Sequence, residues 1–302
     1  MRISLVLGSG GARGYAHIGA IEELQSRGHE IVAVAGASMG ALVGGAYAAG
    51  RLQELTETAL RLSRTDVLMM ARPSLNAPGL IKLDRVMSLL ERIIGNVRIE
   101  DLAIPYTAVA TDLLAHREIW FHTGPLLVAI RASIAMPSVF KPVMLHGRLL
   151  VDGGLVNPLP METSLRLDTD LTVAVSLFGR ERGREFGGAI EVSSEESGET
   201  TPTALNRLQE RISEVLPTRS RPASVLNHFD PLPNDLDLVD MITMSLDVMQ
   251  ERIQASRVAV NPPDVHIEVP ASTATIFDFN DAARIIELGR ELAAAQFDEA
   301  GL

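Results

Sequence analysis

The chain has 302 residues, of which 46% are hydrophobic and 22% charged, so it can bury a substantial core in one or two domains. Its formal net charge of −11 disfavours binding to nucleic acids, and the lack of cysteine excludes disulfides and thiolate metal sites. The first residues, MRISLVLGSGG, lack the apolar length of a secretory signal and run into a glycine turn, so we expect a cytoplasmic protein.

Short β-branched runs alternate with helical patterns along most of the chain. Strands are predicted, in chain order, at residues 2–7, 30–36, 107–112, 118–122, 148–154, 171–177 and 265–269. Helices are predicted at 15–28, 39–50 and 280–300. This alternation indicates βαβ units, and the predicted fold is therefore α/β, with a three-layer arrangement of a mostly parallel sheet flanked by helices.

The alternation is broken at residues 66–83, which carry two prolines between helical stretches, and at 178–201. Residues 178–201 are rich in Gly, Glu and Ser, which predicts a flexible linker, and helical patterns follow at 202–216 and 235–258. We therefore predict a single domain over residues 1–302 with a flexible linker and helical insertion at about 178–262. Within the linker, RERGR at 180–184 is either a solvated loop or a contact for anionic lipid headgroups.

The run IVAVAGASMGALVGGAYAAG, at residues 31–50, contains no charged residue. Its twenty residues meet the length requirement for a membrane span. Its glycines and its β-branched first half favour a buried strand, a turn and a buried helix instead.

A first glycine-containing segment, LVLGSGGARG at residues 5–14, follows the first predicted strand. Glycines between a strand and a helix let backbone N–H groups bind an anion at the positive end of the helix dipole. A nucleotide-binding loop is the alternative. The Lys-Ser/Thr pair of a P-loop is absent, however, and the hexad that ends at Gly14 begins with Ser9 where a dinucleotide-binding pattern requires glycine.

A second segment, GASMG at residues 36–40, matches the G-x-S-x-G pattern of a nucleophile elbow. A serine in a tight strand-to-helix turn needs small neighbours, and Gly36 and Gly40 supply them. Ser38 would then project at a helix N-terminus. The alternative is that Ser38 is an ordinary N-cap residue.

A third segment, LLVDGGLVNPLP at residues 149–160, places Asp152 at the end of an apolar strand. Asp152 either closes an Asx turn or presents a carboxylate at the same sheet edge as Ser38. All three segments follow strands that are predicted to be parallel, whose carboxyl ends meet at one edge. Together they supply an anion cradle, a nucleophile and a base, which is the set that acyl transfer requires.

The seven histidines do not offer an alternative base. None follows a late strand in a loop, as the order Ser, Asp, His would require; His266 lies inside an alternating run, and His17 is predicted to pack on the first helix. We therefore favour a Ser38–Asp152 dyad in which burial raises the pKa of Asp152. No cluster of His and carboxylates at ligand spacing occurs, so we expect neither a metal nor a cofactor.

The three segments in this order resemble the bacterial patatin-like phospholipase family, whose pattern is G-G-x-[KR]-G, then G-x-S-x-G, then D-G-[GA]. The resemblance extends to the blocks ARGYAHIGAIEEL, AVATDL and IRASIAMPSVFKPV, and to the C-terminal PDVHIEVP and FDFNDAARIIELG. It implies a Ser–Asp acyl hydrolase with Ser38 as nucleophile and Asp152 as base. It also implies an oxyanion hole formed by backbone N–H groups of Gly10, Gly11, Ala12, Arg13 and Gly14.

The implied substrate is a lipid or lysolipid ester, cleaved by an activity of the phospholipase A, lysophospholipase or carboxylesterase type, and any membrane contact would be peripheral. Two alternatives stay open: an acyltransferase that uses the same serine, and a non-catalytic lipid-binding regulatory protein. Ser9 departs from the glycine that many family members have, and residues 178–262 resemble the family least.

Overall fold

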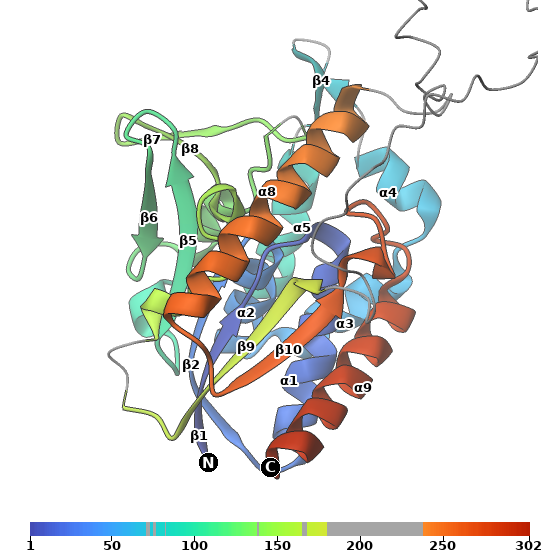
Figure 1. Cartoon of the computed structure of the whole chain (residues 1–302). Helices are drawn as coiled ribbons and strands as arrows, with labels where there is room; N and C mark the ends of the chain where they lie inside the picture. Colours follow the sequence, from blue (N-terminus) through green and yellow to red (C-terminus); the bar gives the residue numbers. More distant parts are fainter. Residues whose placement is uncertain (71–72, 75–76, 82, 138, 165–167, 180–237) are drawn as a thin grey trace, which may run out of the picture. The chain divides into compact units, whose positions relative to one another are not determined.

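A computed structural model of the chain describes residues 1–70, 73–74, 77–81, 83–137, 139–164, 168–179 and 238–302 (Figure 1). All of these residues belong to one compact unit. The RERGR stretch, the predicted linker beyond residue 179 and the helical pattern at 202–216 lie outside the described residues. The single domain with an insertion therefore stays a prediction.

A mixed, mostly parallel sheet of eight strands forms the centre of this unit, as predicted for an α/β fold. Its strands are β1 (Arg2–Leu7), β2 (Glu30–Ala37), β5 (Tyr106–Asp112), β6 (Arg117–Phe121), β7 (Val143–Leu145), β8 (Arg148–Asp152), β9 (Leu171–Gly179) and β10 (Val265–Pro270). The order is β10-β9-β1-β2-β5-β8-β7, with β6 also paired to β5. Pairing is parallel from β10 to β5 and antiparallel for β6, β7 and β8.

The remaining elements are helices and one small hairpin. The helices are α1 (Ala16–Ser26), α2 (Met39–Ala48), α3 (Leu52–Arg61), α4 (Arg64–Met70), α5 (Asp84–Ile94), α6 (Leu126–Ser133), α8 (Leu238–Val260) and α9 (Ala282–Ala300). Short 3₁₀ helices are η1 (Gly11–Tyr15), η2 (Ile99–Asp101), η3 (Gly153–Leu155), η4 (Met161–Thr163) and η6 (Ala271–Thr273). The hairpin pairs β3 (Pro73–Ser74) with β4 (Ala77–Ile81).

Helices cover both faces of the sheet, which confirms the three-layer prediction. Leu5 and Leu7 of β1 belong to the core that contains α1, α2 and α9. Because side chains alternate along a strand, Val6 points to the other face, where it packs with Leu159 and, through that cluster, with Val258 of α8. Figure 1 shows α8 crossing this second face.

The uncharged run 31–50 forms most of β2, the turn at Ser38 and the buried helix α2, as predicted. Both elements belong to the core, so the run is uncharged because it is packed inside the unit. Within the described part of the chain, no helix combines the length and the apolar character needed to cross a bilayer.

The direction of β8 differs from the prediction. The segment 148–154 was predicted to be a parallel strand, but β8 runs antiparallel to β5 and ends at Asp152. It follows β7 through a two-residue turn in which His146 has φ 48° and Gly147 φ 76°. Positive φ at both central residues is the geometry of a type I′ hairpin, which forces the two strands to be antiparallel.

Strand β9 continues to Gly179, so the predicted linker cannot begin at residue 178. The helical pattern predicted at 235–258 is α8, described from Leu238 to Val260.

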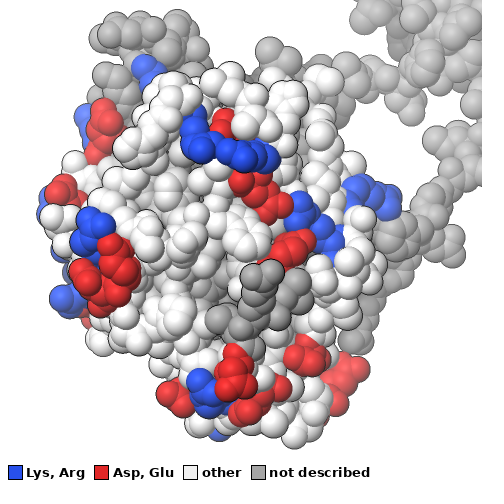
Figure 2. All heavy atoms as spheres, turned by 90° about the vertical axis from the view of Figure 1, so that its left-hand side faces the viewer, with Lys and Arg blue, Asp and Glu red and all other residues white. Residues whose placement is uncertain are grey.

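Charged side chains on the face that carries β6, β7 and β8 lie in groups of mixed sign. Figure 2 shows Lys and Arg beside Asp and Glu around a broad area without charges. Arg148 of β8 pairs with Asp112 at 3.0 Å, for example. The described residues of this face therefore form no separate basic patch of the kind that nucleic-acid binding requires.

We predict that Gly19→Ala destabilises the protein, although alanine normally favours a helix over glycine by about 1 kcal/mol. A Cβ at Gly19 would lie 2.0 Å from the carbonyl oxygen of Ile286 in α9, so α1 and α9 would have to separate. We expect a loss of about 1–3 kcal/mol and a lower Tm in thermal unfolding. Gln53→Ala, on an exposed position of α3, is the control; a Tm of Gly19→Ala at or above wild type would contradict this packing.

Candidate active site

Ser38 occupies the turn between β2 and α2. Its backbone has φ 54° and ψ −121°, a conformation that is strained for a residue with a side chain. Ser38 occupies the N-cap position of α2, but its side chain makes no capping hydrogen bond to the helix, so it is not an ordinary N-cap serine. Instead, the Ser38 hydroxyl donates a hydrogen bond to Asp152 Oδ2 at 2.5 Å.

Two glycines permit this turn. A Cβ at Gly36 would lie 2.3 Å from the carbonyl carbon of Gly40, and a Cβ at Gly40 would lie 2.1 Å from the carbonyl oxygen of Leu7. The obstructing atoms belong to the backbone and cannot move aside. The small residues of the GASMG segment therefore allow the elbow to pack directly against the end of β1.

Ser133, at the end of α6, holds the elbow from the other side. The N–H of Ser38 donates to Ser133 Oγ at 2.9 Å, and the Ser133 hydroxyl donates to the carbonyl of Val109 at 2.6 Å. Ser133 was not predicted as a site residue. Its one signal in the sequence was its position in the block 130–143, which resembles the family.

Asp152 is held by several hydrogen bonds. Its N–H donates to the carbonyl of Ala135, and its carbonyl accepts from the hydroxyl of Thr111. The carboxylate accepts from the N–H of Gly154 at Oδ1, 2.7 Å away, and from Ser38 at Oδ2. The side chain can therefore keep one orientation toward Ser38.

Burial raises the pKa of Asp152 from 3.8 to about 7, while the hydrogen bonds from Ser38 and Gly154 lower it. The burial effect is larger because the residue is only 3% exposed. A carboxylate with such a pKa is a stronger base than a solvated aspartate and is still ionised at slightly alkaline pH.

The glycine turn before α1 lies close to the elbow. A Cβ at Gly14 would be 2.1 Å from Cγ of Met39, and Gly11 lines the same cavity as Ser38. The N–H of Ala12 donates to the carbonyl of Ile276 at 3.1 Å, so it is already used. Because the first N–H groups of a helix lack partners within it, those of Gly10 and Gly11 are the candidates for binding an anion.

The side chain of Arg13 is buried below this turn. It is 1% exposed, and its Nε donates to the carbonyl of Gly10 at 3.1 Å. Its Nη2 donates to Asp247 Oδ2 of α8 at 2.8 Å, and its guanidinium lies 5.1 Å from the ring centroid of Phe178. Neither contact was predicted from the sequence.

The two histidines considered above, His17 and His266, make hydrogen bonds to groups other than Ser38 and Asp152. His17 is fully buried on α1 beside the glycine turn, as predicted, with Nε2 2.8 Å from the carbonyl oxygen of Gly8; burial lowers its pKa to about 4. His266 lies in β10, with Nε2 3.0 Å from Ser176 Oγ. Across the described ranges, no three His, Asp or Glu side chains are grouped so that they could hold a metal.

A cavity of about 180 Å³ is lined by Ser38 and by residues that include members of α3, α4 and α5. Its walls are almost entirely apolar. They include Tyr15, Met39, Leu42, Leu55, Ala59, Leu62, Val67, Leu83, Val86, Leu89, Leu90, Ile93, Ile134, Met136, Val139, Phe140, Ile276, Phe277 and Phe279. The cavity can therefore accept a hydrocarbon chain next to the Ser38 hydroxyl.

The fold and the site together define a three-layer α/β protein in which a strained serine is hydrogen-bonded to a buried aspartate. The patatin-like phospholipase family matches residues 5–165, which include every one of the predicted site residues. The chain belongs to this family. At the family level, membership supports a lipid acyl hydrolase.

Relatives with similar sequences include an uncharacterized NTE family protein of Mycobacterium tuberculosis. It is 40% identical over 324 residues, covering 97% of this chain and 90% of its own length. Patatin-like phospholipase domain-containing protein 6 of Homo sapiens is 30% identical over 181 residues, or 58% of this chain and 13% of that protein. The crystal structure of VipD from Legionella pneumophila matches with a TM-score of 0.45 and 14% identity, over 99% of this chain and 67% of that one.

We predict that the Tm of Asp152→Asn increases relative to the Tm of wild type as the pH rises from 4 to 7. Stabilisation by the protonated carboxyl is complete below 3.8, the ordinary pKa, and is lost as the pH approaches about 7, the pKa in the folded protein. Asparagine stays neutral throughout. The difference in Tm, variant minus wild type, should therefore increase from pH 4 to 7 and then level off in differential scanning calorimetry.

Ser38→Ala is the control because it retains the titrating carboxyl. Its Tm should fall with rising pH as that of wild type does, but the fall should extend to higher pH. The reason is that the hydroxyl that lowers the pKa of Asp152 is removed. A flat difference in Tm between Asp152→Asn and wild type would contradict the raised pKa.

Proposed function

We propose that the protein is a serine acyl hydrolase that cleaves fatty-acyl esters of lipids through an acyl-enzyme on Ser38. The 2.5 Å hydrogen bond from Ser38 Oγ to Asp152 Oδ2, with Ser38 lining an apolar cavity, carries this proposal. Membership of the patatin-like phospholipase family supports a lipid ester as the substrate class.

In the first half-reaction, Asp152 accepts the hydroxyl proton of Ser38 while Oγ attacks the ester carbonyl carbon. The tetrahedral intermediate collapses, and the departing alcohol takes the proton from Asp152. In the second half-reaction, water attacks the acyl carbonyl carbon while Asp152 accepts a proton from it. The second tetrahedral intermediate then breaks its bond to Ser38 Oγ, which takes the proton back from Asp152, and the fatty acid leaves. The raised pKa of Asp152 suits both steps because the base works near its own pKa.

Negative charge that develops on the carbonyl oxygen needs hydrogen-bond donors. The N–H groups of Gly10 and Gly11 take this role, because that of Ala12 is bonded to Ile276 and those of Arg13 and Gly14 lie inside η1. The proposed oxyanion hole is thus narrower than the five residues implied by the resemblance. Removing one such donor typically costs about 10²–10³ in kcat.

Replacement of the dyad tests the proposal. Wild type should release p-nitrophenol from p-nitrophenyl esters, whereas Ser38→Ala and Asp152→Asn should lose about 10³-fold or more in kcat/KM, since one removes the nucleophile and the other the base. Both variants should remain folded, which circular dichroism can verify.

Gln53→Ala provides the matched control, on α3 away from the dyad, and should keep wild-type activity. Equal activity of Ser38→Ala and wild type would overturn the proposal and favour the non-catalytic lipid-binding alternative. Mass spectrometry of the products in the presence of a lysolipid separates hydrolysis, which gives free fatty acid, from acyl transfer, which gives an acylated acceptor.

The cavity should also determine the length of the acyl chain. Ala59 of α3 lines it and is 3% exposed, so a phenylalanine there would fill part of the space. We predict that Ala59→Phe lowers kcat/KM for a dodecanoyl ester at least tenfold relative to a butanoyl ester, because a longer chain needs more of the cavity. An unchanged ratio between the two esters would show that the chain binds elsewhere.

A further inference from the structure

Helix α8 makes polar contacts with the segments that carry the site. Asp247 pairs with Arg13 of η1, Gln250 accepts from the hydroxyl of Ser9 in the glycine turn, and Arg257 pairs with Glu162. Glu162 belongs to η4, in the loop that follows Asp152. The helix therefore touches both the glycine turn and the aspartate loop.

The contact through Asp247 acts on a single peptide group. Arg13 Nε holds the carbonyl of Gly10 at 3.1 Å, while Nη2 of the same guanidinium is held by Asp247 at 2.8 Å. The carbonyl of Gly10 and the N–H of Gly11 belong to one planar trans peptide, so they point in opposite directions. Fixing the carbonyl on the Arg13 side therefore fixes the direction in which the N–H of Gly11 points.

This peptide needs an external support because glycines flank it on both sides. Gly10 has φ 153° and Gly11 φ 60°, and glycine can leave such conformations at little cost. Arg13 can support the peptide only while its own side chain is fixed. Its Nη1 also donates to the carbonyls of Leu177 at 3.4 Å and Ala271 at 3.5 Å, but these groups carry no charge. The guanidinium is almost completely buried, and a buried charge without a charged partner is strongly unfavourable, so the carboxylate of Asp247 is the partner that holds it most strongly.

We propose that Asp247 is a positioning residue for the oxyanion hole, acting through Arg13 on the Gly10–Gly11 peptide. This inference rests on the proposed function, in which the N–H of Gly11 stabilises the tetrahedral intermediate. Asp247 does not touch the substrate. Its role makes α8, in the segment that least resembles the family, a part of the catalytic architecture.

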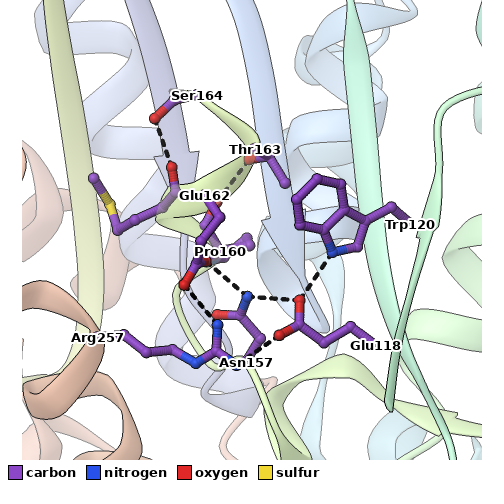
Figure 3. Close-up of polar contacts among 9 residues, drawn as sticks. Glu118, Trp120, Asn157, Pro160, Glu162, Thr163, Ser164 and Arg257 are labelled. Carbon is purple, nitrogen blue, oxygen red and sulfur yellow. Dashed lines mark hydrogen bonds and ion pairs between the residues drawn. The ribbon is translucent and has the colours of Figure 1, made fainter. Parts of the chain in front are cut away.

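The other end of α8 offers a matched control. Figure 3 shows Arg257 between the carboxylates of Glu118 and Glu162, with Asn157 bonded to both glutamates. Both ion pairs of Arg257 measure 2.6 Å. Arg257→Gln breaks them without touching the glycine turn, so it loosens the docking of α8 while leaving Arg13 and Asp247 paired.

The test measures kcat and KM for p-nitrophenyl butanoate with wild type, Asp247→Ala, Asp247→Asn and Arg257→Gln. Asp247→Ala should lower kcat at least tenfold with KM within twofold, since the oxyanion donor acts in the transition state and not in substrate binding. Asp247→Asn keeps an acceptor oxygen for Arg13 and should fall between Asp247→Ala and wild type. Arg257→Gln should stay within twofold of wild type in both constants.

A second readout uses a butyl trifluoromethyl ketone, which forms a tetrahedral adduct with a nucleophilic serine. Its inhibition constant should rise by the same factor by which kcat/KM falls in each Asp247 variant, because the adduct needs the same oxyanion donors. A purely structural loss of folded protein would lower the active concentration without changing this constant. If Asp247→Ala does not fold, Asp247→Asn carries the comparison.

Unchanged kinetics in both Asp247 variants, with an active wild type, would overturn this inference and leave the proposed function intact. An equal loss in Arg257→Gln and Asp247→Ala would overturn it too, because the effect would then come from docking of the helix in general. An inactive wild type would overturn the proposed function, and this inference with it.

Discussion

The candidate site depends on one hydrogen bond between two groups that water barely reaches. A solvated aspartate is a poor base for a serine hydroxyl, because its pKa lies far below that of the alcohol. Burial of Asp152 narrows this gap by disfavouring the charged carboxylate, while the N–H of Gly154 and the Ser38 hydroxyl keep the rise limited to a pKa of about 7. The basicity of Asp152 therefore depends on its burial, and any change that admits water to the carboxylate would weaken it as a base.

The two partners meet because several elements converge on Val109 of β5. Its register partner in β2 is Ala37, the residue before Ser38, and its carbonyl accepts the hydroxyl of Ser133 that holds the Ser38 N–H. The carbonyl oxygen of Val109 also packs closely against Gly153. A Cβ at Gly153 would lie only 2.0 Å from this oxygen. Since β8 enters antiparallel and pairs with the last three residues of β5 alone, it stops at Asp152, level with the elbow. The register with β5, in which Asp152 lies opposite Ala110, therefore fixes the position of the carboxylate.

The alternation of β1, α1, β2 and α2, the three layers and the places of Ser38 and Asp152 at strand ends could be predicted, because periodicity and turn residues are local signals. The direction of β8 could not be predicted from its own apolar pattern, which is the same in parallel and antiparallel strands; the information lay in the turn at His146 and Gly147. Ser133 and Asp247 were missed for another reason. Their partners lie 95 and 234 residues away in the chain, so nothing near them in the sequence distinguishes them from ordinary polar residues.

A contact with α8 also explains why the sequence departs from the family pattern at position 9. Ser9 stands where many family members have glycine, and its hydroxyl donates to Gln250 of α8 at 2.8 Å. Gln250 is 4% exposed, and buried polar groups are rarely left without a partner. The serine and the glutamine are therefore two halves of one contact, and a glycine at position 9 would remove the donor to Gln250. The unusual residue just before the G-G-x-[KR]-G motif and a helix outside the family match at 5–165 thus belong together, because α8 packs on this site through Ser9 and Arg13.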